Sequence, residues 1–188
     1  MDKVRLAFSG SGFLAPIHAG AAAAFMDQHV DIVEVAGTSG GSIVAACVAA
    51  GLGAVDLHRI ATSPIPAAIM DTQLWTLIRP GKPNGKNDGK LLLGWLRAMI
   101  GYGNTRFKDC QMPVTIMASD IQGAKPYEFT REKTPDTELA FACRCSASVP
   151  VVWAPVDLGN GVVLADGGMC NNIPTDKLVV DDIPRVGI

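Results

Sequence analysis

The strongest chemical signal in the sequence is a serine between glycines, in the run Gly37-Thr38-Ser39-Gly40-Gly41. An apolar stretch typical of a strand precedes this G-x-S-x-G pattern, and an uncharged stretch typical of a buried helix follows it. A sharp strand-to-helix turn lifts the serine side chain clear of the sheet, and its glycine neighbours leave room for adjacent backbone. The pattern therefore predicts Ser39 as a nucleophile. The alternative is a glycine-rich turn whose serine only caps the helix.

A nucleophilic serine needs hydrogen-bond donors for the negative charge that develops on the substrate oxygen. The run Gly10-Ser11-Gly12 follows one predicted strand and precedes a helix, so its backbone N–H groups are expected to supply those donors. The N-terminal end of the helix after Ser39 favours the same charge through its dipole. Gly10, Ser11 and Gly12 are the expected oxyanion loop.

The serine also needs a base, and the three histidines, His18, His29 and His58, all lie early in the chain. A Ser-His-Asp site of the α/β-hydrolase type places its histidine after the acid, late in the sequence, so that order is excluded here. Asp166 ends a predicted strand and precedes two glycines. An aspartate in reach of Ser39 takes its proton directly if burial raises the pKa of the carboxyl enough. The alternative is an aspartate that opens a glycine turn.

Taken together, six segments resemble the patatin-like phospholipase family in the order in which they occur. They are Ser9–Gly12, Pro16–Gly20, Gly37–Gly41, Ala118–Asp120 with Gly123, Ser146–Ser148 with Pro150, Trp153 and Pro155, and Asp166–Gly168 with Asn171–Pro174. The resemblance implies a three-layer α/β/α fold, a Ser39–Asp166 dyad and an oxyanion loop at Gly10, Ser11 and Gly12. It also implies hydrolysis of fatty acyl esters of phospholipids or other acyl lipids at a membrane surface, with no cofactor and no metal.

The glycine loop departs from the family pattern at three positions. Ser11 replaces the middle glycine, Leu14 stands at the basic position and Ala15 at the last glycine. The backbone donors survive these changes, whereas a positive charge is lost, so weak activity or a less anionic lipid is expected. A catalytically silent lipid-binding module is one alternative, and an acyltransferase or thioesterase that uses the same acyl-serine is another.

The loop also fits a dinucleotide-binding pattern, because Gly10 to Ala15 reads G-x-G-x-x-A and Glu34 follows at a suitable spacing. This interpretation is disfavoured, since Glu34 lies inside its predicted strand and Ser39 and Asp166 would have no role.

Strands that alternate with helices predict an α/β domain whose central sheet is mostly parallel. Strands are expected at Val4–Phe8, Asp31–Ala36, Pro113–Ser119, Pro126–Thr130 (paired with the preceding one), Val162–Ala165 and Arg185–Ile188. Helices are expected from Pro16, over Ser42–Ala50, over Leu91–Ile100 and within Pro135–Ser148, and an exposed loop over Pro80–Lys90. A single catalytic domain over residues 1–188 is expected, cut short at its C-terminus because a new strand begins there.

Composition and charge limit which partners and which cellular compartment we expect for the protein. The net charge of −2 does not favour binding to nucleic acid, which requires an excess of basic residues. The five cysteines have no metal-ligand spacing, which favours buried free thiols in a reducing compartment. No secretory signal is visible, and the uncharged stretch Val35–Val55 is broken by the Gly37–Ser42 turn, so no transmembrane segment is expected. These features predict a cytoplasmic protein with peripheral membrane contact.

Overall fold

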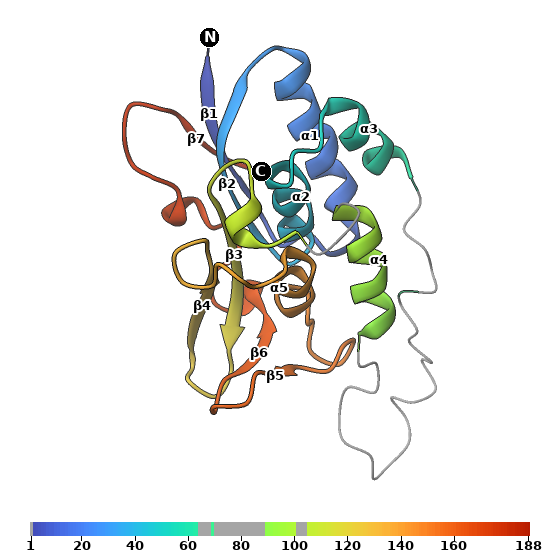
Figure 1. Ribbon diagram of the computed structural model, residues 1–188, viewed down its shortest axis with the longest axis vertical. Coiled ribbons are helices and arrows are strands. Elements are labelled where there is room, and N and C mark those ends of the chain that lie inside the picture. The colour runs from blue at the N-terminus through green and yellow to red at the C-terminus, as the bar shows by residue number, and fades with distance from the viewer. Residues whose placement is uncertain (1, 64–68, 70–88, 101–104) are drawn as a thin grey trace.

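The computed structural model describes residues 2–63, 69, 89–100 and 105–188 of the chain (Figure 1). Its sheet has seven strands in the order β5-β6-β3-β2-β1-β7, with β4 paired to β3. The strands are β1 (Lys3–Phe8), β2 (Asp31–Thr38), β3 (Val114–Asp120), β4 (Lys125–Phe129), β5 (Val156–Asp157), β6 (Val163–Asp166) and β7 (Arg185–Gly187). The helices are α1 (Ala15–Asp27), α2 (Gly40–Ala49), α3 (Ala54–Thr62), α4 (Lys90–Ile100) and α5 (Leu139–Ser146).

The sheet is mixed. The β1–β2, β1–β7 and β2–β3 pairs are parallel, whereas β3–β4, β3–β6 and β5–β6 are antiparallel. The α/β class expected from the sequence is confirmed, and the parallel arrangement holds for the four strands β7, β1, β2 and β3. The antiparallel β3–β4 pair follows from the short connection between these strands, which is long enough only for a hairpin.

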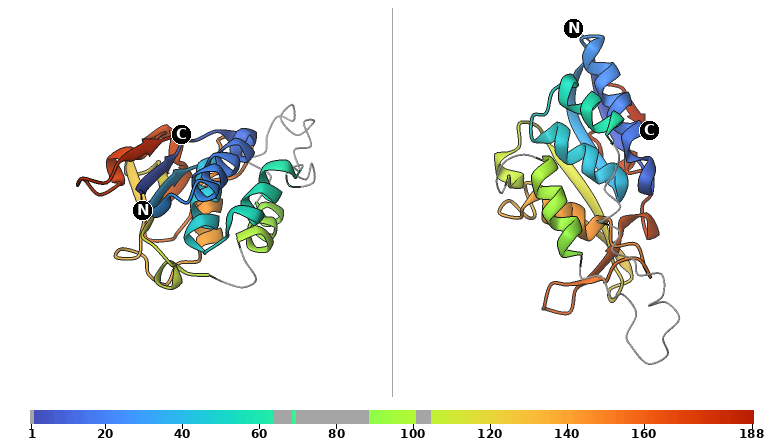
Figure 2. Two further views of the ribbon diagram at one scale, coloured as in Figure 1. Left: turned by 90° about the horizontal axis from the view of Figure 1, so that it is seen from above. Right: turned by 90° about the vertical axis from the view of Figure 1, so that its right-hand side faces the viewer.

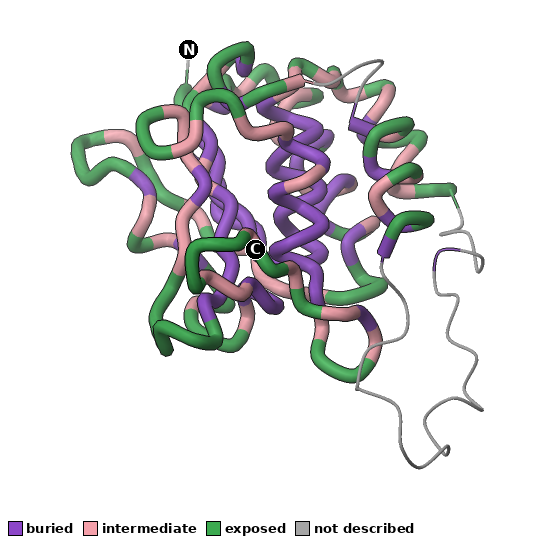
Figure 3. The backbone as a smooth tube through the Cα atoms, turned by 60° about the horizontal axis from the view of Figure 1, so that its bottom comes forward, coloured by how far each residue is buried: buried purple, intermediate pink, exposed green. Residues whose placement is uncertain are grey.

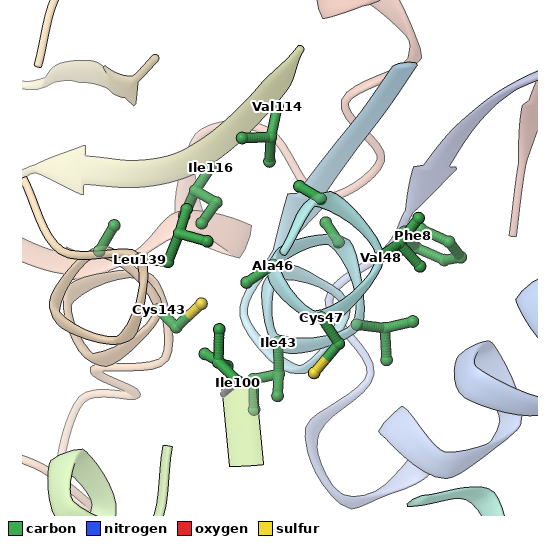
Figure 4. Close-up of a cluster of buried hydrophobic side chains, with 14 of the residues drawn as sticks. Phe8, Ile43, Ala46, Cys47, Val48, Ile100, Val114, Ile116, Leu139 and Cys143 are labelled. Atoms are coloured by element: carbon green, nitrogen blue, oxygen red, sulfur yellow. The ribbon is translucent and has the colours of Figure 1, made fainter. Parts of the chain in front are cut away.

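The α-helices of the described residues lie on one side of the sheet (Figure 2). The main core fills the space between sheet and helices, where side chains of β3, α2, α4 and α5 meet (Figure 4). Helix α2 is buried along its whole length, which agrees with its uniformly apolar sequence (Figure 3). On the second face a smaller cluster forms, in which Leu178 from the segment after β6 packs on Ala7 and Ala36.

Most of the expected elements are found within a few residues of their expected bounds. The uncharged stretch Val35–Val55 folds as the end of β2, the turn at Ser39 and helix α2, as expected. Among the α-helices and strands of the described residues, helix α3 and the two-residue strand β5 were not anticipated. Most of the expected loop Pro80–Lys90 lies outside the described residues. None of the described helices has the length and apolar composition of a bilayer span.

Candidate active site

The register of β3 brings the two candidate catalytic side chains together. Strand β2 pairs in parallel with the first half of β3, and its last residue Thr38 lies opposite Met117. Strand β6 pairs antiparallel with the second half, and its last residue Asp166 lies opposite Ala118. Because β4 occupies the other edge of β3 over these residues, β2 and β6 share one edge and their carboxyl ends meet there. Ser39 and Asp166 are consequently neighbours.

Ser39 has a strained backbone, with φ of 50° and ψ of −122°, which is the kind of turn that the predicted nucleophile elbow requires. The flanking glycines are needed for space. A Cβ on Gly37 would come within 2.6 Å of the carbonyl oxygen of Gly41, and one on Gly41 within 2.4 Å of the carbonyl oxygen of Phe8. The turn is thus pressed against the end of β1, as the glycine spacing predicts.

The Ser39 hydroxyl donates a 2.6 Å hydrogen bond to Oδ2 of Asp166. Both residues are buried, with 5% and 7% of their surface exposed. Burial raises the pKa of the Asp166 carboxyl above its ordinary value, because the charged form loses hydration. The hydrogen bonds from Ser39 and from the Gly168 amide, which reaches Oδ1 at 2.8 Å, act in the opposite direction. The carboxylate therefore contacts the serine hydroxyl directly, and the net shift of its pKa is upward.

Ser146, at the end of α5, holds the elbow in place. Its hydroxyl accepts a 2.8 Å hydrogen bond from the Ser39 N–H and donates to the carbonyl of Met117 on β3. One buried hydroxyl thus connects α5, β3 and the turn. The sequence marked Ser146 only as part of a small-residue segment, since nothing local shows that it contacts Ser39.

The glycine loop lies against the elbow, but its amides differ in availability. The Gly10 N–H donates to the Asn172 carbonyl at 2.9 Å, so this amide is already engaged. Gly12 has a φ of +55°, and its amide nitrogen is 3.1 Å from the position that a Cβ on Gly40 would take. The Ser11 hydroxyl lies 2.8 Å from the same position. The loop therefore packs directly against Gly40 at the start of α2, and the Gly12 carbonyl oxygen lies closest, 2.6 Å from the same position.

An apolar cavity of about 680 Å³ begins at Ser39. Gly12 and Gly40 border it near the nucleophile, and residues of α2, α3, α4 and the turn after α5 form its walls. Among the wall residues are Ile43, Val44, Ile60, Trp95, Met99 and Trp153. Pockets of roughly 300–1,000 Å³ with mainly apolar walls are typical of small-molecule and lipid sites. The cavity suits a long hydrocarbon group attached to a carbonyl at Ser39.

The remaining candidate residues have structural partners. His18 is buried against Phe8, with its Nε2 3.4 Å from the Ser9 hydroxyl, and burial lowers its pKa. Glu34 forms a 2.7 Å ion pair with Arg5, so its carboxylate is not placed for a ribose. Four of the five cysteines are buried free thiols, as expected, whereas Cys170 is exposed. Among the described residues no cluster of His, Cys, Asp or Glu suitable for a metal ion is found.

Two adjacent asparagines join the three segments of the site, a role that sequence reasoning did not detect. The Asn171 carbonyl accepts from the Thr38 hydroxyl at 2.8 Å, and the Asn171 N–H donates to the Gly167 carbonyl at 2.9 Å. The Asn172 carbonyl accepts from Gly10. The elbow, the glycine loop and the turn after Asp166 are thus tied to one point of the chain.

Comparison with solved structures identifies proteins of similar fold. Among solved structures, VipD from Legionella pneumophila matches with a TM-score of 0.62 and 16% identity, over 98% of this chain and 49% of that one. ExoU from Pseudomonas aeruginosa, in complex with SpcU, matches with a TM-score of 0.59 and 18% identity, over 81% and 39%. At these identities the likeness shows a shared fold.

Sequence relatives are longer than this chain. The uncharacterized protein YqhO of Bacillus subtilis is 29% identical over 189 residues, 89% of this chain and 64% of its own length. A probable lipid hydrolase, 463L, of Invertebrate iridescent virus 6 is 38% identical over 61 residues, 32% of this chain and 21% of its own length. This chain therefore spans less than two thirds of either relative. A family model described as patatin-like phospholipase matches residues 6–179, and the chain belongs to that family.

Proposed function

We propose that this chain is a lipid acyl hydrolase of the phospholipase A type, a serine esterase with Ser39 as nucleophile and Asp166 as base. The observation that carries the proposal is the 2.6 Å hydrogen bond between these two buried side chains, beside an apolar cavity that begins at Ser39. Family membership supports a lipid substrate. We further propose that residues 1–188 form one catalytic domain.

In the proposed reaction, Asp166 accepts the Ser39 proton while Oγ attacks the ester carbonyl. The amides of Ser11, Gly12 and Gly40 hold the oxyanion, whereas Gly10, whose amide is engaged, serves as the close-packed anchor of the loop. The tetrahedral intermediate collapses to an acyl-serine, and the leaving alcohol takes the proton from Asp166. Water then attacks the acyl-serine with Asp166 again as base, and the fatty acid leaves.

The surface around the site supports a substrate within a lipid layer. Phe13, Leu14 and Ile17 are exposed beside the glycine loop, and Met169 and Ile173 are exposed beside the turn after Asp166. Apolar side chains around a catalytic opening suit contact with lipid rather than with water alone. We propose that the protein works peripherally at a membrane surface.

The test measures fatty acid release from phosphatidylcholine, from a neutral glyceride and from an acyl thioester, with wild type and Ser39→Ala. Release from phosphatidylcholine by the wild type alone supports the proposal. Preference for the thioester, or transfer of the acyl group to an added alcohol, favours the acyltransferase or thioesterase alternative. If a folded wild type releases nothing from any of the three, the proposed hydrolase is wrong and a lipid-binding module is favoured.

A further inference from the structure

The side chain of Asn172 lies beside the proposed dyad on the side away from the cavity. A Cβ on Gly10 would come within 2.4 Å of Oδ1 of Asn172 and 3.5 Å of Cβ of Ser39. A Cβ on Gly168 would come within 3.0 Å of the same Oδ1 and 2.9 Å of Oδ1 of Asp166. The carboxamide thus fills a notch between the two glycines, and the positions of these two added Cβ atoms also neighbour Ser39 and Asp166.

This side of the site faces solvent. Asn172 is exposed, whereas Ser39 and Asp166 are buried. Of the described residues, those that line the cavity include Ser39, Gly12 and Gly40 but none of Gly10, Asp166, Gly168 and Asn172. If the acyl chain of an ester at Ser39 occupies the cavity, the exposed side beside Asp166 and Asn172 is the place we assign to its alcohol half.

The oxygen of the leaving alcohol gains negative charge as the ester bond breaks, and a hydrogen-bond donor beside it would stabilise that charge. When the tetrahedral intermediate collapses, the bond between carbon and the leaving oxygen breaks and its electron pair stays on that oxygen. The oxygen then takes the proton that Asp166 accepted from Ser39. A carboxamide carries two N–H donors and one acceptor, and rotation about its last bond presents either end.

We propose that Asn172 is a further catalytic residue, whose carboxamide donates a hydrogen bond to the leaving-group oxygen as the ester bond breaks. The proposal rests on the proposed esterase function. The Asn171–Asn172 pair then has two separate roles. The backbone carbonyls join the turn at Ser39, the glycine loop and the turn after Asp166, and the Asn172 side chain contacts the substrate. The proposal also explains why Gly10 and Gly168 lack side chains, since a Cβ on either would displace the carboxamide.

The test compares two soluble esters with the same acyl chain, p-nitrophenyl octanoate and ethyl octanoate, through kcat/KM. The p-nitrophenolate ion leaves without needing a proton, whereas ethoxide needs one. We expect Asn172→Ala to lower kcat/KM for the ethyl ester by about tenfold or more and for the p-nitrophenyl ester by less than about threefold. Asn172→Leu fills the notch without a donor, and the same pattern is expected of it.

Equal losses on both esters, or full activity of Asn172→Leu on the ethyl ester, would mean that the side chain acts through packing, and the proposal would be wrong. Undiminished activity of Asn172→Ala on the ethyl ester would overturn it as well. Failure of the proposed function itself is distinguishable, because the wild type would then hydrolyse neither ester. Thermal unfolding of each variant shows whether its fold is kept.

Discussion

At the scale of single residues, Asp166 determines how the protein should respond to pH. Burial raises the pKa of its carboxyl, and only the ionised form accepts the Ser39 proton. Activity should therefore fall as the pH drops through the raised pKa, with the midpoint of the acid limb above the ordinary value for an aspartate. The measurement is kcat/KM for a soluble ester as a function of pH. An acid limb at or below the ordinary aspartate value would contradict the assignment.

Ser39 itself should show the cost of its backbone conformation. With φ of 50° it lies where glycine is favoured, and such strain costs about 1–3 kcal/mol. Ser39→Ala and Ser39→Gly both remove the hydroxyl, so their difference isolates the strain. We expect Ser39→Gly to have the larger free energy of unfolding, by about 1 kcal/mol after the extra chain entropy of glycine. Urea unfolding measures it, and an Ala variant as stable as the Gly variant would argue against strain.

The sequence predicted Ser39 from its local pattern, whereas it predicted Asp166 mainly from the family resemblance, and both catalytic roles stay predictions. Ser39 has its glycines on both sides, and Asp166 precedes two glycines at a strand end. The engagement of the Gly10 amide could not be predicted, since its partner Asn172 lies near the other end of the chain. A glycine in the sequence indicates that the backbone can pack closely at that position, but it does not show which segment packs there.

At the scale of elements, Ser146 tests how α5 and β3 support the elbow. Ser146→Ala leaves the buried N–H of Ser39 without its partner, which typically costs about 1–3 kcal/mol. We expect lower stability together with lower kcat, because the nucleophile loses its anchor. Ser119→Ala is the matched control, since that hydroxyl is equally buried but its contact with the Gly167 carbonyl is 3.5 Å long.

Urea unfolding and ester hydrolysis of both serine variants provide the comparison. Equal, small effects at Ser146 and Ser119 would show that the elbow does not depend on the Ser146 hydroxyl.

The order of strands and helices was largely predictable, whereas the pairing that builds the site was not. Periodicity and turn residues located β1, β2, α2 and β3. The shared edge of β3, where β2 and β6 meet, arises from register, which depends on tertiary packing. Helix α3 was not among the elements expected from the sequence.

At the scale of the whole molecule, three segments that border Ser39 and Asp166 carry no charge, although Asp56 and Arg59 of α3 line the cavity. No Asp, Glu, Lys or Arg occurs in residues 6–26, 145–156 or 167–175. Attraction to anionic lipid would therefore have to come from elsewhere, and apolar contact is left as the main source of binding at this surface. We expect hydrolysis of phosphatidylcholine vesicles to depend weakly on salt.

The double variant Leu14→Gln/Ile17→Gln tests that surface. These side chains are 61% and 62% exposed, and loss of their apolar contact should slow hydrolysis of phosphatidylcholine vesicles about tenfold. Hydrolysis of a soluble ester should stay unchanged. Val180→Gln is the control, because Val180 is 75% exposed but lies away from these segments along the chain. A double variant that matches wild type on vesicles would rule out this surface.

The most direct test of the central claim is reaction with a fluorophosphonate, which labels activated serines, followed by mass spectrometry to locate the label. Wild type should be labelled at Ser39 alone, and Asp166→Asn, which keeps the shape of the side chain but cannot accept the proton, should react far more slowly. A folded wild type that stays unlabelled, or an Asp166→Asn variant labelled at Ser39 as fast as wild type, would contradict the proposed dyad.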